Sequence, residues 1–385
     1  MSAREFQIVK DEDRQPEQPR KLAEITPPLI FGELRKGVLG QDRALRFAAV
    51  AIYKHTNAGS SGNMLLVGNS GTGKTTIMNS VQRLYESIPE YRGFRVMTIL
   101  NANLLVDNER VEFRGGRLLA AVEQRARMLL GAEPTAAQLT EAIERATICI
   151  DEIDKMTTLI LGRPNPVGAV LQQGLLTLME GGKVPYRTLA WSDGVEEKVT
   201  LEIDTERMMF ICGGAFEGLY DQVHERVSQS GELQKMRTET IRTADGRIRI
   251  MERFDLAQFL KLKDLFAYGM VPQFISRFDK LVLLDDLSIP TLKQILLESR
   301  DSPFVLSRRD FASRGVRLEM DDAAASVLAE RAAQEPRSGA RALRDLFAAV
   351  INPYEFDPEF SSLEPLEDGT HRLVIDGETV RSALR

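Results

Sequence analysis

Apolar and polar positions along the chain follow two periods. Short apolar runs, such as 63–67 and 147–150, have the length and composition of buried parallel strands. Longer segments carry apolar residues at helical spacing, and we expect helices within 29–56, 76–85, 291–298 and 321–334. Strands and helices alternate from Met64 to about Leu284, which predicts an α/β fold with a mostly parallel sheet covered by helices.

The alternation of strand and helix patterns stops at both ends of this region. Residues 1–28 are charged and rich in proline, so we expect a flexible N-terminal arm. From Ser288 the pattern is helical, with a late strand at 372–375. We therefore expect a large domain over 29–285 and a small, mostly helical C-terminal domain over 286–385.

Two segments interrupt the large domain. Residues 187–204 alternate around Asp193-Gly194, which predicts a β-hairpin with an Asp-Gly turn and Trp191 near its tip. Residues 222–253 are polar and highly charged, and we expect an exposed, mobile insertion there.

Composition excludes several classes of protein. The 385 residues are 43% hydrophobic and 28% charged, as in globular proteins, and the net charge of −6 gives no basic field for nucleic acid or anionic membrane. No apolar run approaches the ~20 residues of a membrane span, and residues 1–20 lack a secretory pattern, so we expect a cytoplasmic protein. Two cysteines, Cys149 and Cys212, lie in apolar runs and are expected to be small buried side chains.

The clearest chemical motif lies between the run at 63–67 and the helix predicted after it. Gly68-Asn69-Ser70-Gly71-Thr72-Gly73-Lys74-Thr75 fits G-x-x-x-x-G-K-[ST], the phosphate-binding loop. Its glycines let backbone N–H groups face phosphate oxygens at a helix N-terminus. Lys74 can reach the β and γ phosphates, and the Thr75 hydroxyl can bind Mg²⁺. The alternative is a glycine-rich turn before an ordinary helix.

Two acids follow the buried run at 147–150. Asp151 and Glu152 stand at the carboxyl end of this predicted strand, where ligands bind in open α/β sheets. Asp151 would hold Mg²⁺ through water, and Glu152 would orient and polarise the attacking water. The alternative is a solvated strand end. Both acids together favour a hydrolysing NTPase over a passive nucleotide binder.

Six segments in the same order resemble the AAA+ ATPases, and within them the ClpX-like protein unfoldases. Val38-Leu39-Gly40-Gln41 is similar to the box that contacts adenine. Residues 150–155 resemble the Walker B block, and residues 171–181 resemble the helix after it. Residues 209–216 resemble a ClpX-type strand and turn, 270–278 the arginine-finger block, and 338–344 the sensor-2 block.

This resemblance implies roles for particular residues. Val38 and Leu39 would contact the adenine of ATP. Arg277 would reach the γ-phosphate in a neighbouring subunit, a role worth ~10³–10⁵ in rate in other systems. Arg341 would couple nucleotide state to the angle between the two domains. Their ordinary alternatives are a surface salt bridge for Arg277 and a surface charge for Arg341. The implied assembly is a homo-oligomeric ring, a hexamer, that hydrolyses ATP with Mg²⁺.

Several positions depart from the family pattern. Phe113-Arg114-Gly115 lies where the pore loop is expected, but Arg114 replaces an apolar residue; the alternative is an ordinary charged loop. The hairpin around Trp191 carries Asp193, Glu196 and Glu197, where relatives have a basic substrate-entry loop. No aliphatic-Gly-Phe tripeptide, which would dock the ClpP peptidase, occurs between Glu217 and Tyr268.

Two further family features have no counterpart in the pattern. The N-terminal zinc domain is not found, and the strand ending in Cys212-Gly213-Gly214 offers no sensor-1 residue. We therefore expect a protein unfoldase or remodeller that works without ClpP. A nucleic-acid-acting AAA+ ATPase and a slow nucleotide-dependent switch or scaffold remain as alternatives. The negative net charge disfavours the first and Glu152 disfavours the second.

Overall fold

The computed structural model describes residues 22–58, 62–107, 111–160, 162–230, 237–242, 248–253, 256–335, 338–357, 363–367 and 369–385. Most of the predicted N-terminal arm lies outside these ranges. Its last residues belong to the fold instead: helix α1 begins at Pro27, and Ile25 is buried beneath it. An apolar side chain at this position therefore anchors the segment that we expected to be flexible.

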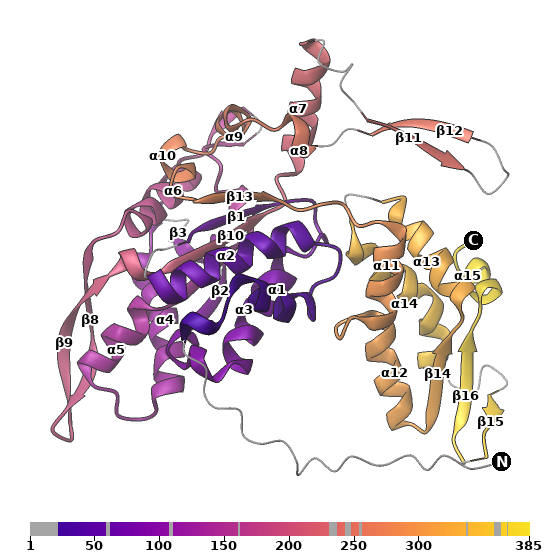
Figure 1. Cartoon of the computed structure of the whole chain (residues 1–385), viewed down its shortest axis with the longest axis horizontal. Coiled ribbons are helices and arrows are strands. Elements are labelled where there is room, and N and C mark those ends of the chain that lie inside the picture. Colours follow the sequence, from indigo (N-terminus) through magenta and orange to yellow (C-terminus); the bar gives the residue numbers. More distant parts are fainter. Residues whose placement is uncertain are drawn as a thin grey trace.

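A five-stranded parallel sheet organises the first 285 residues (Figure 1). Its order is β13-β1-β10-β5-β2, so that β1 and β5, which precede the two predicted phosphate-site segments, flank β10. The strands are β1 (Met64–Val67), β2 (Met97–Asn101), β5 (Thr147–Asp151), β10 (Met209–Gly214) and β13 (Lys280–Leu283). The predicted α/β fold with a parallel sheet is confirmed.

Helices cover both faces of the sheet because strand side chains alternate between two cores. Leu65 and Val67 enter one core with α4 (Gly115–Leu130), α5 (Ala136–Glu144), α6 (Pro166–Met179) and α7 (Glu217–Gln229). Met64 and Leu66 enter the other with α1 (Pro27–Arg35), α2 (Asp42–Ala58) and α3 (Lys74–Ser87). Cys149 and Cys212 are both buried and unpaired, on opposite faces, as expected for small apolar side chains.

The C-terminal residues have a core of their own, built around Leu296, Phe311, Leu328, Phe347 and Ile375. Figure 1 shows this group beside the parallel sheet, in orange to yellow. On the basis of the separate core we propose residues 286–385 as the small domain. Its elements are α11 (Ile289–Glu298), α12 (Pro303–Ser313), β14 (Val316–Met320), α13 (Asp322–Ala333), α14 (Ala340–Phe356), β15 (Glu364–Pro365), β16 (His371–Ile375) and α15 (Gly377–Ala383).

The predicted Asp-Gly hairpin is confirmed. Strands β8 (Lys183–Ser192) and β9 (Val195–Asp204) pair along their full length, and Trp191 lies opposite Glu196 beside the turn. Both turn residues have positive φ, 50° at Asp193 and 82° at Gly194, which matches the right-handed twist of a two-residue hairpin.

The expectation for residues 222–253 is partly wrong. Residues 222–229 belong to α7, in which Leu219, Val223 and Val227 recur every four residues and are buried against the core. The charged residues between these positions give the segment the composition of a loop, although its apolar spacing is helical. Farther on, β11 (Arg237–Arg242) and β12 (Ile248–Arg253) form an antiparallel hairpin, whereas 231–236 and 243–247 lie outside the described residues. Within the described ranges, the helices are too short or too polar to cross a bilayer.

Candidate active site

The loop between β1 and α3 has the geometry of a phosphate cradle. Gly71 and Gly73 have φ angles of 72° and 106°, a left-handed backbone that side chains disfavour. Helix α3 begins at Lys74, and its cap residue Gly73 provides no side-chain hydrogen bond to the first turn. The N–H groups of that turn are therefore available to an anion.

Lys74 lies inside this loop. Its Nζ donates to the carbonyl oxygens of Gly68 at 2.6 Å and Asn69 at 2.9 Å. Burial lowers the pKa of Lys74, while the nearby carboxylate of Asp151 acts in the opposite direction. The ammonium thus lies inside the loop, where it could bind a phosphate held by the loop.

Thr75 and Asp151 meet at the carboxyl edge of the sheet. Thr75 Oγ1 donates to Asp151 Oδ2 at 2.6 Å, so the two predicted magnesium residues share one site. One hydroxyl and one carboxylate suit Mg²⁺, which binds few protein oxygens and keeps phosphate and water ligands. Among the described residues no group of three or more His, Cys, Asp and Glu could hold a metal alone, so this donor set fits Mg²⁺ carried by a nucleotide.

Glu152 follows directly and is held in an unusual conformation. Its φ of 59° is left-handed, which is rare for a residue other than glycine and is concentrated at functional sites. Lys155 Nζ at 2.7 Å and Asn101 Nδ2 at 2.6 Å both donate to its Oε2. The hydrogen bonds from Lys155, first, and Asn101 lower the pKa of Glu152, so the side chain is an ionised base.

Asn101 is a site residue that sequence reasoning missed. It ends β2, and the parallel register places it opposite Asp151 at the end of β5. The sequence does show an amide side chain at the end of the segment that forms β2. It does not show that β2 and β5 are neighbours, which follows only from the order of strands in the sheet.

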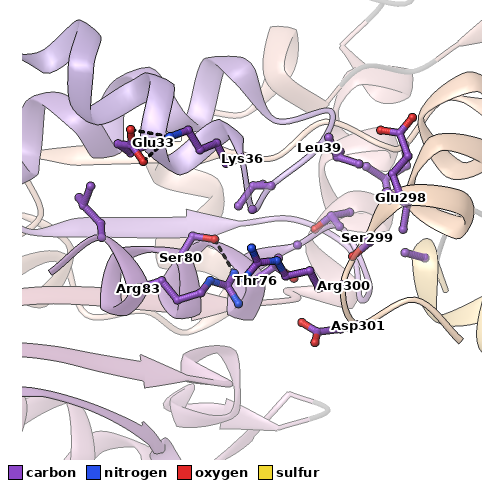
Figure 2. Close-up of a pocket in the computed structure, with 18 of the residues that line it drawn as sticks. Glu33, Lys36, Leu39, Thr76, Ser80, Arg83, Glu298, Ser299, Arg300 and Asp301 are labelled. Atoms are coloured by element: carbon purple, nitrogen blue, oxygen red, sulfur yellow. Dashed lines mark hydrogen bonds and ion pairs between the residues drawn. The ribbon is translucent and has the colours of Figure 1, made fainter. Parts of the chain in front are cut away.

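A cavity of about 350 Å³ opens beside the loop and lies between the large domain and the C-terminal group. Val38 and Leu39, the predicted adenine residues, line it together with Gly71, Thr72 and Gly73. Figure 2 shows Leu39 beside Glu298, with Ser299, Arg300 and Asp301 below them and Ser80 and Arg83 of α3 to the left. The cavity can receive the base and sugar of a nucleotide whose phosphates lie on the glycine loop.

Gln41 joins this loop to the segment that leads into α11. The side chain is buried, and its Nε2 donates to the carbonyl oxygens of Thr72 at 3.0 Å and Asp285 at 2.8 Å. Its Oε1 accepts from the Asp285 N–H at 3.1 Å. Sequence reasoning placed Gln41 in the adenine-contacting segment but did not predict this clamp.

The structure also brings Arg341 to the site. The Ala340 N–H donates to the Gly71 carbonyl at 3.1 Å, and a Cβ placed on Gly339 would lie 2.8 Å from the Ser70 carbonyl. The N-terminus of α14 therefore rests on the phosphate loop. Burial is the main cause of the lowered pKa of Lys74, and the positive charge of Arg341 acts in the same direction.

Arg277 is not brought to this site. Its Nη2 pairs with Glu180 Oε1 at 3.1 Å, and its carbonyl accepts from Asn63 Nδ2 at 3.2 Å. Asn63 directly precedes β1, whereas the phosphate loop follows β1, so Arg277 lies at the opposite edge of the sheet. Within one chain, it is a half-exposed salt-bridge residue.

The predicted pore-loop residues lie beside α6. Phe113 ends β4 (Glu112–Phe113) and is half-buried, and a Cβ on Gly174 of α6 would lie 2.1 Å from its Cγ. The aromatic ring thus occupies the space above Gly174. Arg114 precedes α4, which begins at Gly115, and its N–H donates to the Leu105 carbonyl.

The hairpin at Trp191 is fastened to the body of the protein. The Trp191 backbone N–H donates to the Pro134 carbonyl, Tyr186 Oη donates to Glu123 of α4 at 2.6 Å, and Arg127 Nη2 of α4 donates to Thr188 Oγ1 at 3.3 Å. Strand β10 ends in Cys212-Gly213-Gly214, to which we assign no sensor-1 role, and a Cβ on Gly213 would lie 3.6 Å from Asp151 Oδ1.

Comparison with known proteins shows the family to which this chain belongs. The family described as AAA domain (Cdc48 subfamily) matches residues 60–281, which hold the loop, both acids and Arg277. The ATP-dependent Clp protease ATP-binding subunit ClpX of Bacteroides thetaiotaomicron is 27% identical, over 87% of this chain and 78% of its own. ClpX 2 of Wolinella succinogenes is 28% identical over 91% and 83%, and ClpX 3 of Methylococcus capsulatus is 28% identical over 92% and 80%. The chain therefore belongs to the AAA domain (Cdc48 subfamily) family, as a divergent ClpX-like AAA+ ATPase.

Proposed function

We propose that this protein is an ATP-driven ring motor that unfolds or remodels a protein client. One observation carries the proposal. Lys74, Thr75, Asp151 and Glu152 converge at one edge of the sheet, while Arg277 lies at the other edge. This separation fits a ring in which the Arg277 of one subunit completes the site of its neighbour.

Each residue then has a chemical task. Lys74 and the N–H groups of the α3 first turn bind the phosphates, and Thr75 with Asp151 holds Mg²⁺, which when bound neutralises charge on the phosphate oxygens. Glu152 accepts a hydrogen bond from the attacking water and orients it. Asn101 and Lys155 both bind Oε2, so Oε1 is the oxygen directed to that water.

Arg277 would complete the neighbouring subunit's site. Its side chain is 40% exposed, and its partner Glu180 is a surface carboxylate at 46% exposure. Such a pair contributes little to stability and exchanges readily for a phosphate oxygen. We propose a homohexamer because the resembled family forms such rings.

The contact between α14 and the phosphate loop supports a motion driven by hydrolysis. Arg341 would pair with the γ-phosphate and lose this partner when the phosphate leaves. Gln41 and the bond from Asn69 Nδ2 to Asp286 Oδ1, at 3.0 Å, tie the same loop to the start of the small domain. A change at the loop would therefore turn the small domain against the large one.

The client would be a polypeptide gripped by Phe113, with Arg114 and Gly115 beside it. We propose no ClpP-type peptidase as partner, because the aliphatic-Gly-Phe tripeptide does not occur in 217–268 of the sequence. Hairpin β11–β12 occupies part of that stretch. The ClpX relatives are named as subunits of a protease, so this divergence separates the proposed function from theirs.

The shared site can be tested with two inactive variants. Glu152→Gln and Arg277→Ala should each abolish steady-state ATP hydrolysis while retaining ATP binding. Mixing them should restore part of the activity, because the arginine of one variant then serves the intact glutamate of the other. Arg314→Ala is the matched control, since Arg314 is equally exposed and pairs with Asp310. An active Arg277→Ala variant, or no recovery on mixing, would refute the shared site.

A further inference from the structure

Gln172 is a fully buried polar residue near the middle of α6, and its side-chain amide joins two segments that are far apart in the chain. Its Nε2 donates to the carbonyl oxygens of Met156 at 2.6 Å and Gly269 at 3.1 Å. Its Oε1 accepts from the Val271 N–H at 2.7 Å. Both amide hydrogens and the amide oxygen are therefore used.

The first of these segments carries the hydrolytic glutamate. Met156 ends the 3-10 turn η5 (Ile153–Met156), which begins directly after Glu152. Within this turn, Lys155 binds Glu152 Oε2, and Asp154 Oδ1 accepts from the Ala215 N–H at 3.1 Å. Holding the Met156 carbonyl therefore fixes the end of the turn that sets the position of Glu152.

The second segment carries the arginine. Val271 is the cap residue of α10 (Pro272–Ile275), and Arg277 follows two residues after that helix. Glu180 lies just beyond α6 and pairs with Arg277. The segment from Val271 to Arg277 is therefore held at its start by Gln172 and at its end by Glu180. The Gly269 carbonyl also accepts from Thr158 N at 2.8 Å and Thr158 Oγ1 at 3.0 Å, a second link from the Glu152 side.

We propose that Gln172 is a positioning residue that links Glu152 in one catalytic site to Arg277, which serves the next site. The inference rests on the proposed function, since only in a ring does Arg277 contact nucleotide. Three hydrogen bonds made by a fully buried side chain form a rigid connection, because breaking any of them leaves a buried group unpaired. Rearrangement of Glu152 on hydrolysis would then shift the arginine presented to the neighbour.

A buried glutamine could instead serve packing alone, and kinetics separate the two roles. Gln172→Met keeps the length and volume of the side chain and removes the three hydrogen bonds. We expect kcat for ATP to fall at least about tenfold while KM changes less than about threefold, because the phosphate loop is untouched. Gln173→Met, the same change at the exposed neighbouring position, should leave both values unchanged.

Thr158→Val provides a milder variant that does not disturb α6. It removes only the hydroxyl bond to the Gly269 carbonyl and keeps the side-chain volume. We expect kcat to fall about threefold with KM unchanged. Thermal melting of each variant establishes that the folded protein is being measured, and normal kcat in folded Gln172→Met or Thr158→Val would overturn the proposal.

Mixed assemblies test the link itself. A subunit with Gln172→Met should restore activity neither to Glu152→Gln, which lacks the base, nor to Arg277→Ala, which lacks the finger, because both of its own functions are displaced. Recovery with either partner would mean that Gln172→Met displaces only Glu152 or only Arg277, and this would overturn the proposed link. Glu152→Gln mixed with Arg277→Ala is the reference; if that mixture also stays inactive, the shared site fails, and the link with it.

Discussion

Asn101 donates a 2.6 Å hydrogen bond from its side-chain nitrogen to Oε2 of Glu152, across two neighbouring parallel strands. The bond holds the carboxylate that we propose as the hydrolytic base, at a position of left-handed backbone. Lys155 binds the same oxygen from the other side. The position of the base therefore depends on a residue about fifty positions earlier in the chain.

Asn101→Ala should lower kcat for ATP hydrolysis at least about tenfold and leave ATP binding unchanged, since the asparagine touches the base and not the phosphate loop. Steady-state kinetics and nucleotide titration measure the two effects. Asn103→Ala, at an exposed position two residues on, is the control. A variant with normal kcat would show that Lys155 alone holds Glu152.

Gly174→Ala should destabilise the fold by about 1–3 kcal/mol, because the new methyl group would overlap the ring of Phe113. Phe113→Ala removes the obstacle, so the double variant should be no less stable than Phe113→Ala alone. Denaturant unfolding of all three proteins measures this coupling. Gly116→Ala, where a Cβ meets nothing within 4 Å, is the control. Additive losses would mean that the ring does not occupy this place.

Gly339→Ala should raise KM for ATP about tenfold, or about 1.4 kcal/mol, by pushing the N-terminus of α14 off the phosphate loop. Gly339 has a φ of 51°, so part of any loss of stability comes from backbone strain. Gly315→Ala separates the two effects: Gly315 has a φ of 76°, but a Cβ there meets nothing within 4 Å. Equal KM values for both variants would argue against a functional contact.

His55 should make the fold sensitive to acid. Burial lowers its pKa from 6.5 to about 4, so the folded protein resists a proton that the unfolded chain accepts. Stability should therefore fall as pH drops from 6.5 towards 4, by up to about 3 kcal/mol. Chemical unfolding from pH 7 to pH 4 measures the slope, which His55→Gln should reduce and the same change at exposed His371 should not. An unchanged slope in His55→Gln would contradict the assignment.

Residues that act through their neighbours in the chain were predictable from sequence. Gly68 to Thr75 form one turn between a strand and a helix, and Asp151 with Glu152 follows one buried strand, so local pattern places them. The Asp193-Gly194 turn is equally local. These features needed no knowledge of sheet order.

Contacts between distant segments were not predictable in this way. Asn101 meets Glu152 only because β2 lies beside β5, and Gln172 reaches Met156 and Val271 only after α6 has packed on both segments. The same holds for Gln41, which clamps Asp285. In α7, the charged residues between Leu219, Val223 and Val227 obscured the four-residue spacing of these buried side chains, so composition outweighed periodicity there.

In the proposed function, nucleotide hydrolysis drives work on a polypeptide. The most direct measurement is the steady-state ATPase rate of the full chain with an unfolded protein and, separately, with DNA, using Phe113→Ala alongside wild type. We expect that the unfolded protein raises the wild-type rate, that DNA does not, and that Phe113→Ala loses the stimulation but keeps the basal rate. Stimulation by DNA, or none by polypeptide, would contradict it.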